Sequence, residues 1–247
     1  MALVNELDKQ GIFLFRYRGQ FPVFLFILSV PFLYLTDIKS LSPSLKETYR
    51  CSAVILSFLG FFIRSITVGT TPKGTSGRNT KEQKAYVLNT SGIYSTVRHP
   101  LYLGNYFMWI GIVVFTYNLY LIAIVSLLYW IYYERIMYAE ERFLERKFGE
   151  DYVIWASSLP AFFPNLKLYK SSIIPFSFKS VLRREYSGVL ATVIGFIFVE
   201  LIRGYFSNGE CFISQSFLCL LFTVSFVALF LRTLKHHTDL LSEDGRS

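Results

Sequence analysis

The sequence predicts an all-α protein whose helices cross a membrane several times. Of its 247 residues, 53% are hydrophobic, 18% are aromatic and only 17% are charged. Several apolar runs approach the roughly 20 residues that a helix needs to cross a bilayer. A soluble protein with buried helices is the alternative, but its surface would need more polar residues. We therefore expect a polytopic helical membrane protein.

Six apolar segments can be drawn as transmembrane helices. The third and fourth are separated only by Tyr117 and Asn118, which predicts a tight antiparallel hairpin. Gly204, Asn208 and Gly209 predict the turn between the last two segments. The six segments cover residues 21–35, 51–68, 103–116, 119–137, 187–202 and 212–231.

Lysine and arginine concentrate on one predicted side of the membrane. The loops 69–98 and 138–186 lie on that side, whereas the other side carries only Lys39, Lys46, Arg50 and Arg203. This asymmetry predicts that both termini are cytoplasmic, at the inner membrane if the host is bacterial. It also accounts for the net charge of +8, so nucleic acid is not an expected partner.

The sequence offers no sign of a cleaved signal peptide or of a metal site. The first apolar segment is not followed by a small-residue cleavage site. Cys51, Cys211 and Cys219 form neither a metal-binding nor a disulfide pattern. We expect no bound metal.

The second long loop carries further helical signals. Residues 138–148 should extend the fourth span as a charged helix, which Gly149 would end. Residues 152–163 are amphipathic and aromatic, which predicts a helix lying on the lipid headgroups. A similar amphipathic piece is expected over residues 173–184.

The stretch GIYSTVRHPLYLGNY, from Gly92 to Tyr106, lies where the first loop meets the third span. Pro100 can begin a helix, whose first N–H groups are free and favour an anion. Gly104 permits the close approach of another group. The alternative is structural: Arg98 reaches the interface, the tyrosines form an aromatic belt and Gly104 packs helices.

A second group of charged residues follows the fourth span. Glu134 and Arg135 lie at the membrane boundary, where ionised groups are usually paired or functional. The hairpin should bring Glu140 and Glu141 beside the start of the third span, so we expect them in a site. Glu145 and its neighbours are expected to form ion pairs on a solvated helix face.

A longer pattern combines both groups. It reads Gly92-x-Tyr94-x-x-x-Arg98-His99-Pro100-x-Tyr102-x-Gly104, then Glu140-Glu141, then Phe148-Gly149-x-x-Tyr152 and Pro160-x-x-x-Pro164. This combination resembles the isoprenylcysteine carboxyl methyltransferase and phospholipid methyltransferase superfamily over roughly residues 50–166. The resemblance implies a methyltransferase core with a cofactor pocket (51–166). An N-terminal membrane segment (1–50) precedes this core, and a helical extension with two spans (167–247) follows it outside the resemblance. The Tyr-x-x-Tyr of the family is Tyr152-x-x-Trp155 here.

The resemblance implies S-adenosylmethionine as cofactor and a membrane lipid as substrate. Carried over by position, the cofactor-binding residues would be Leu88, Gly92, Tyr94, Arg98, His99, Tyr102, Gly104, Glu140 and Glu141. For catalysis, Arg98 or Arg135 would position an acidic acceptor, and Glu134 or Glu141 would accept the proton of an amine.

Three acceptors remain open: a prenylcysteine carboxylate, the amine of phosphatidylethanolamine, and a lipid phosphate. We expect an acidic headgroup, with a phosphate of the lipid A 1-phosphate type ahead of the carboxylate. Two other classes are a nicotinamide-dependent membrane reductase and a non-catalytic scaffold or lipid transporter. Stabilisation by S-adenosylmethionine or its homocysteine product would separate them. Residues 167–247 would form either a substrate-specific part or an oligomer interface, and the oligomeric state is left open.

Overall fold

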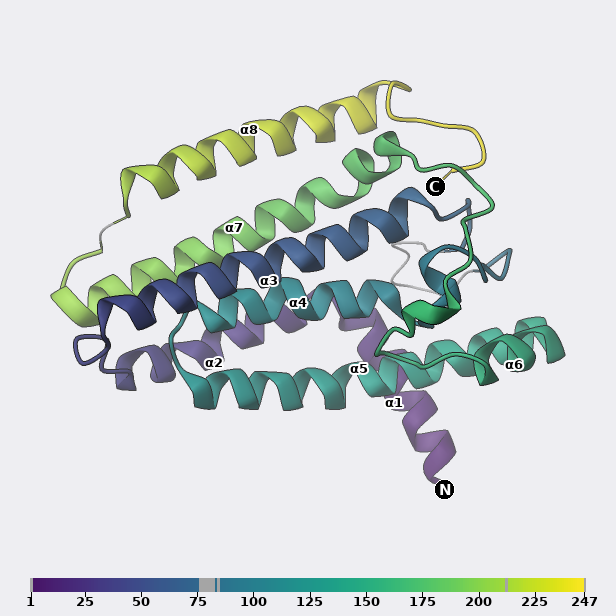
Figure 1. Cartoon of the computed structure of the whole chain (residues 1–247), viewed down its shortest axis with the longest axis horizontal. Coiled ribbons are helices and arrows are strands. Elements are labelled where there is room, and N and C mark those ends of the chain that lie inside the picture. The colour runs from purple at the N-terminus through teal and green to yellow at the C-terminus, as the bar shows by residue number, and fades with distance from the viewer. Residues whose placement is uncertain (1, 76–82, 84, 212, 247) are drawn as a thin grey trace.

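A computed structural model describes residues 2–75, 83, 85–211 and 213–246 of the chain. Every regular secondary-structure element among the described residues is a helix, as predicted (Figure 1). The helices in chain order are α1 (Leu3–Tyr17), α2 (Phe21–Leu35), α3 (Pro43–Gly69), η1 (Ile93–Ser95), α4 (Pro100–Val114), α5 (Leu119–Phe148), α6 (Glu150–Ser157), η2 (Leu166–Leu168), α7 (Phe178–Asn208) and α8 (Gln215–His237).

Six helices correspond to the six predicted spans, and successive ones run in opposite directions (Figure 1). Among the described residues, α3, α5, α7 and α8 are long and apolar enough to cross a membrane. The helices α2 and α4 have 15 residues each. At 1.5 Å per residue they reach about 22 Å, less than the roughly 30 Å of the hydrocarbon core. Six complete crossings are therefore not confirmed.

The predicted hairpin between the third and fourth spans is confirmed as α4 and α5. Tyr117 turns the chain with a φ of 64°, and the side chain of Asn118 caps α5. The Asn118 amide also donates to the Thr36 hydroxyl at 2.8 Å, and Arg203 donates to the Phe115 carbonyl at 2.9 Å. These bonds tie the turn to the end of α2 and to α7, and the second one gives the Phe115 carbonyl a partner.

Small residues let α3 and α4 approach closely. A methyl group added at Gly60 would lie 2.5 Å from the Gly104 carbonyl oxygen and 2.5 Å from the Met108 nitrogen. One added at Gly111 would lie 2.6 Å from the Ala53 carbonyl oxygen. The two backbones are therefore in direct contact, as at other close crossings of membrane helices.

The segments after the fourth span partly follow the prediction. As expected, α5 continues to Phe148, and Gly149 ends it with a φ of 57°. The predicted interfacial helix is only the eight-residue α6, because the chain after Ser157 turns back toward the bundle. A separate amphipathic piece over residues 173–184 is wrong: Ser177 caps α7, which then runs unbroken from Phe178.

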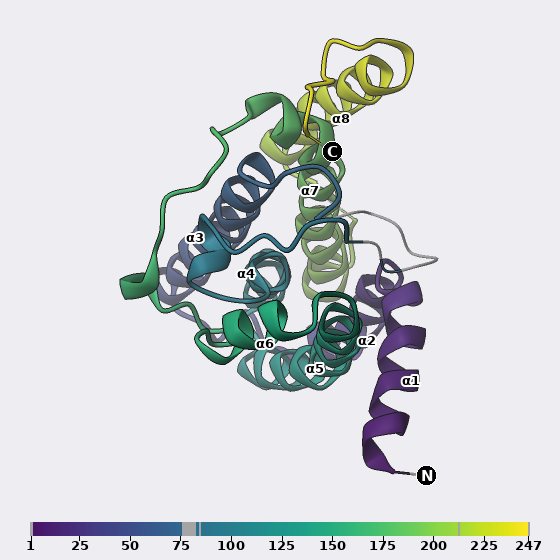
Figure 2. The ribbon, with the colours of Figure 1, turned by 90° about the vertical axis from the view of Figure 1, so that its right-hand side faces the viewer.

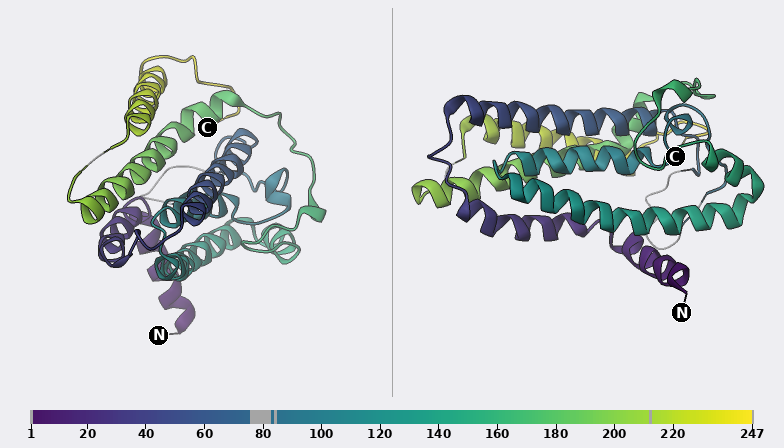
Figure 3. Two further views of the ribbon diagram at one scale, coloured as in Figure 1. Left: turned by 60° about the vertical axis from the view of Figure 1, so that its left-hand side comes forward. Right: turned by 60° about the horizontal axis from the view of Figure 1, so that its bottom comes forward.

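The bundle has a central group of helices and two peripheral ones. The end-on view shows α4 between α3, α5 and α7, with α8 on the outer side of α7 (Figure 2). Helix α1 projects from the other side of the bundle, where it packs on α5 (Figure 3). Both chain ends lie at the end of the bundle that carries α6 (Figure 1). That this end faces the cytoplasm stays a prediction.

The close crossing of α3 and α4 predicts a sharp sensitivity to added volume. Gly60→Ala should destabilise the folded protein by about 1–3 kcal/mol, because the new methyl group meets backbone atoms that cannot move aside. Gly188→Ala is the matched control, since its methyl group would meet only side-chain atoms, the nearest at 3.6 Å. Thermal unfolding in detergent measures both variants. Equal stability of the two variants would contradict the close crossing.

Candidate functional site

The segment before α4 is held in place by the segment that follows α6. Gly92 opens η1 with φ 60° and ψ −137°, a conformation that favours glycine. The N–H groups of Arg98 and His99 donate to the carbonyls of Pro160 and Ala161 at 3.1 and 3.2 Å. Pro100 then begins α4, as predicted. The Arg-His-Pro element thus has a defined backbone, which orients its side chains.

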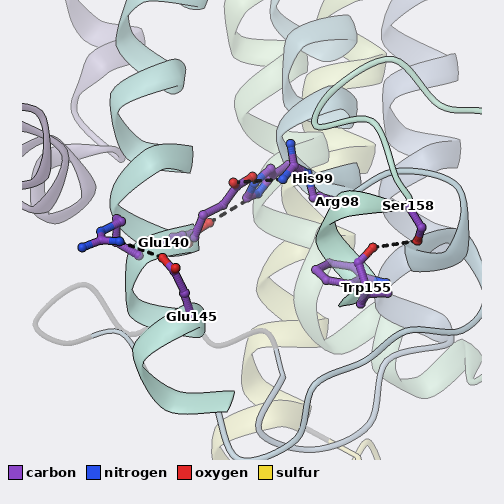
Figure 4. Close-up of polar contacts among 8 residues, drawn as sticks. Arg98, His99, Glu140, Glu145, Trp155 and Ser158 are labelled. Atoms are coloured by element: carbon purple, nitrogen blue, oxygen red, sulfur yellow. Dashed lines mark hydrogen bonds and ion pairs between the residues drawn. The ribbon is translucent and has the colours of Figure 1, made fainter. Parts of the chain in front are cut away.

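Two glutamates of α5 lie beside these side chains. Glu141 accepts from the Arg98 guanidinium at 3.1 Å, and its other oxygen lies 2.8 Å from His99 Nε2. The Glu140 carboxylate lies 3.7 Å from His99 Nδ1. Figure 4 shows this meeting of α5 with the start of α4. The predicted proximity is confirmed, because the α4–α5 hairpin brings residues more than 40 positions apart together.

Helix α6 covers the same cluster from the other side. The Trp155 indole N–H donates to the Tyr94 carbonyl at 3.2 Å, and the Tyr152 ring packs against Trp155. Burial raises the pKa of the Tyr152 phenol, and the nearby Glu141 carboxylate raises it further. Burial, and then Glu140, also raise the pKa of the Tyr94 phenol. Both phenols therefore stay neutral at physiological pH.

A cavity of about 410 Å³ opens between these elements and the bundle. Six of the residues predicted to bind a cofactor line it: Leu88, Tyr94, Arg98, His99, Tyr102 and Glu140. Glu141 stands behind Arg98 and His99, and holds both without lining the cavity itself. The structure therefore gathers most of the predicted cofactor residues around one space.

The remaining predicted residues have other surroundings. Gly92 forms a backbone turn, and Gly104 makes room for Arg64, whose Cγ would lie 2.5 Å from an added methyl group. Glu134 is exposed, and Arg135 donates to the Gln10 side chain at 3.0 Å, next to α1. Neither Glu134 nor Arg135 lines the cavity. A direct catalytic role for either stays a prediction that this geometry does not favour.

Several cavity residues were not predicted from the sequence. Arg64 of α3 donates to both oxygens of Glu185 of α7 at 2.7 Å, and to the Asn105 side chain at 2.6 Å. The position of Arg64 inside an apolar span could have indicated a functional role, because charged residues within membrane spans are usually paired or functional. Arg18 and Arg184 also line the cavity, and only the packing of α1 and α7 against the core reveals them.

Several buried polar atoms around the cavity have no hydrogen-bond partner among the described residues. They are Arg98 Nε, Tyr152 Oη, Asn89 Nδ2 and Gln83 Nε2. A buried polar group without a partner costs about 1–3 kcal/mol, so such atoms seldom gather by chance. Their position around one cavity fits a polar ligand that supplies the missing bonds.

Comparison with known proteins places this site in a family context. Residues 50–151 match the phospholipid methyltransferase family. The cobalt-zinc-cadmium resistance protein CzcN of Cupriavidus metallidurans is 39% identical over 88 residues, which are 36% of this chain and 40% of CzcN. The protein-S-isoprenylcysteine O-methyltransferase of Schizosaccharomyces pombe is 30% identical over 122 residues, 48% of this chain and 50% of that protein.

These similarities are partial. The chain spans about half or less of the length of CzcN and of the S. pombe protein. A probable protein-S-isoprenylcysteine O-methyltransferase of Oryza sativa subsp. indica is 27% identical over 144 residues, 56% of this chain and 75% of that protein. No solved structure is significantly similar. CzcN is named for metal resistance. Among the described residues of this chain, no three His, Cys, Asp or Glu side chains are placed so that they could hold a metal ion.

The matched segment contains most of the residues that line the cavity. It includes the Arg-His-Pro element, the start of α4 and the paired glutamates of α5. Over this segment the chain is similar to the phospholipid methyltransferase family and to the protein-S-isoprenylcysteine O-methyltransferases.

Proposed function

We propose that this protein is an S-adenosylmethionine-dependent methyltransferase that acts on the headgroup of a membrane amphiphile. The main observation that supports this proposal is the cavity of about 410 Å³ that Arg98, His99 and Glu140 line together. These residues lie in the segment that matches the phospholipid methyltransferase family. The apolar helices α3, α5, α7 and α8 suit an enzyme whose substrate stays in the bilayer.

The residues around the cavity have the chemistry to hold this cofactor. Arg98 and the free N–H groups at the start of α4 would bind a carboxylate. Glu140 would accept bonds from ribose hydroxyls or from the amino group, and the Tyr94 and Tyr102 rings would face a sulfonium cation. The unpartnered atoms of Asn89 and Arg98 supply further donors.

When bound, S-adenosylmethionine supplies a methyl group on a positively charged sulfur that leaves as a neutral thioether. The protein's part is to align the acceptor atom with that methyl group and to exclude water. Glu141 serves this alignment indirectly, because it holds both Arg98 and His99 at the cavity wall. An ionised acidic acceptor needs no general base, whereas a protonated amine would first have to lose a proton.

The comparisons support a different acceptor from the lipid A 1-phosphate predicted from the sequence. Two of the proteins described above are named protein-S-isoprenylcysteine O-methyltransferases, and the matching family is that of phospholipid methyltransferases. Neither description mentions a lipid phosphate. We therefore propose a carboxylate of the S-prenylcysteine type ahead of the phosphate, with a phospholipid amine as the remaining candidate.

Cofactor binding is the first test. The homocysteine product of the cofactor should stabilise the detergent-solubilised protein against heat, by about 2–3 kcal/mol at roughly 100 times its Kd. NADPH at the same concentration is the control for the reductase class and should have no effect. Stabilisation by NADPH alone would overturn the methyltransferase proposal. Stabilisation by neither ligand would favour a non-catalytic scaffold.

The position of Glu141 predicts a large effect on rate without loss of the fold. Glu141→Ala should lower methyl transfer about 100-fold or more, because Arg98 and His99 lose the group that orients them. Glu145→Ala is the matched control on the same helix: its ion pair with Arg142 is about 40% exposed, so the rate should stay within about twofold. Equal rates in the two variants would remove Glu141 from the site.

The chemical stability of the product identifies the acceptor. Membranes containing the protein are incubated with methyl-labelled S-adenosylmethionine, and the extracted amphiphiles are treated with mild alkali. A carboxyl methyl ester releases labelled methanol readily, which is the expected result. Slow release would indicate the phosphate ester predicted from the sequence, and label that resists alkali would indicate an N-methylated amine. Membranes with Glu141→Ala protein give the background.

A further inference from the structure

The cavity has two charged ends, and only one is accounted for by the cofactor. The first contains Arg98, His99 and Glu140, at the start of α4. The second contains Arg64, which donates directly to Glu185 and also to the Asn105 side chain. Asn105 follows Pro100 by five residues, so the second end lies about 8 Å further along α4 at 1.5 Å per residue.

We propose that Arg64 binds the anionic headgroup of the acceptor, and that Glu185 and Asn105 hold it in position. This inference rests on the proposed function, because it assigns the second end of the cavity to the second substrate. It also assigns residues 167–247 a part in the acceptor site, since Glu185 belongs to α7.

The hydrogen bonds of Arg64 leave it capacity for a ligand. A guanidinium has five N–H donors, and Arg64 uses three of them on Glu185 and Asn105. Two donors are left for an oxygen anion in the cavity that Arg64 lines. Because both Glu185 oxygens are engaged, the guanidinium plane is fixed before the acceptor arrives, which lowers the entropic cost of binding.

The charge of the cavity favours an anionic acceptor. The charged side chains that line it, within the described part of the chain, are four arginines and two glutamates, a formal charge of +2. The arginines are Arg18, Arg64, Arg98 and Arg184. The Glu185 carboxylate is engaged by Arg64 through both of its oxygens.

The apolar part of the acceptor also has a place. Trp109 lines the cavity one helical turn beyond Asn105, and its ring packs against Phe26 of α2 at 6.1 Å between centroids. Val68 of α3 lines the same cavity. An amphiphile with its anion at Arg64 can thus direct its chain toward Trp109 and the apolar interior of the bundle.

Glycine at position 104 serves this arrangement. An added methyl group there would meet the Arg64 side chain at 2.5 Å from Cγ and 3.4 Å from Cδ. Gly104 therefore lets Arg64 lie flat against α4 on its way to Asn105. This explains the structural role of a motif residue that does not itself line the cavity.

The test compares the binding of acids with that of their uncharged counterparts. The probes are N-acetyl-S-farnesylcysteine against its methyl ester, and phosphatidic acid against diacylglycerol, with the homocysteine product of the cofactor present. The wild type should bind at least one acid about tenfold or more tightly than its uncharged counterpart, the size of a charged hydrogen bond. Preference for the first acid indicates a carboxylate acceptor, and preference for the second a phosphate.

The variants remove the Arg64 charge without leaving a buried charge alone. Arg64→Gln combined with Glu185→Gln should abolish the preference for the acid. Arg64→Lys, which keeps a charge for Glu185 but loses the planar fork, should weaken acid binding about fivefold or more and leave ester binding unchanged. The matched control is Arg203→Gln with Glu200→Gln, an ion pair at the far end of α7 whose arginine is also buried, and this variant should keep the preference.

The outcomes separate this inference from the proposed function. A wild type without preference for either acid, or a folded Arg64 variant of either kind that keeps the full preference, would overturn the role of Arg64. Thermal stabilisation by the homocysteine product is read separately on each variant and should be unchanged. Its absence in the wild type would instead count against the methyltransferase function, whatever the acids do.

Discussion

The antiparallel pairing of α4 with α5 is the constraint on which the site depends. The short turn around Tyr117 places the end of α5 beside the start of α4, at the opposite end of both helices from the turn. Glu141 can therefore reach Arg98 and His99 at once. The three side chains are largely shielded from solvent, where charge-assisted hydrogen bonds are stronger than in open water.

A second constraint is the close contact of α3 with α4. Glycines at positions 60, 104 and 111 remove the side chains that would separate the two helices. The glycines do more than allow close packing, because the space beside Gly104 accommodates the Arg64 side chain. Breaking a buried ion pair such as that of Arg64 and Glu185 is costly, since one charge would remain without a partner. The pair thus joins α3, most of which lies in the segment that matches the family, to α7.

Part of the fold and of the site could be read from residue patterns. The apolar runs predicted the main helices, and the length of the connection predicted the α4–α5 hairpin. From that hairpin alone, Glu140 and Glu141 were expected beside Arg98 and His99, and the distances agree. By contrast, hydropathy does not reveal that α6 is a single short helix of eight residues. Its length depends on where the chain turns back to bond with residues 96–99.

The helical class, the hairpin and the meeting of two charged motifs follow from residue order, because each depends on local periodicity or on a short connection. Which charges share a cavity depends instead on how the helices pack. Glu134 and Arg135 lie within seven residues of the paired glutamates on α5 yet outside the cavity, whereas Glu185, more than 100 residues from Arg64, lines it. The reason is geometric: a helix turns by about 100° per residue, so neighbours in sequence face different surroundings, and the packing of α3, α4 and α7 sets which faces meet.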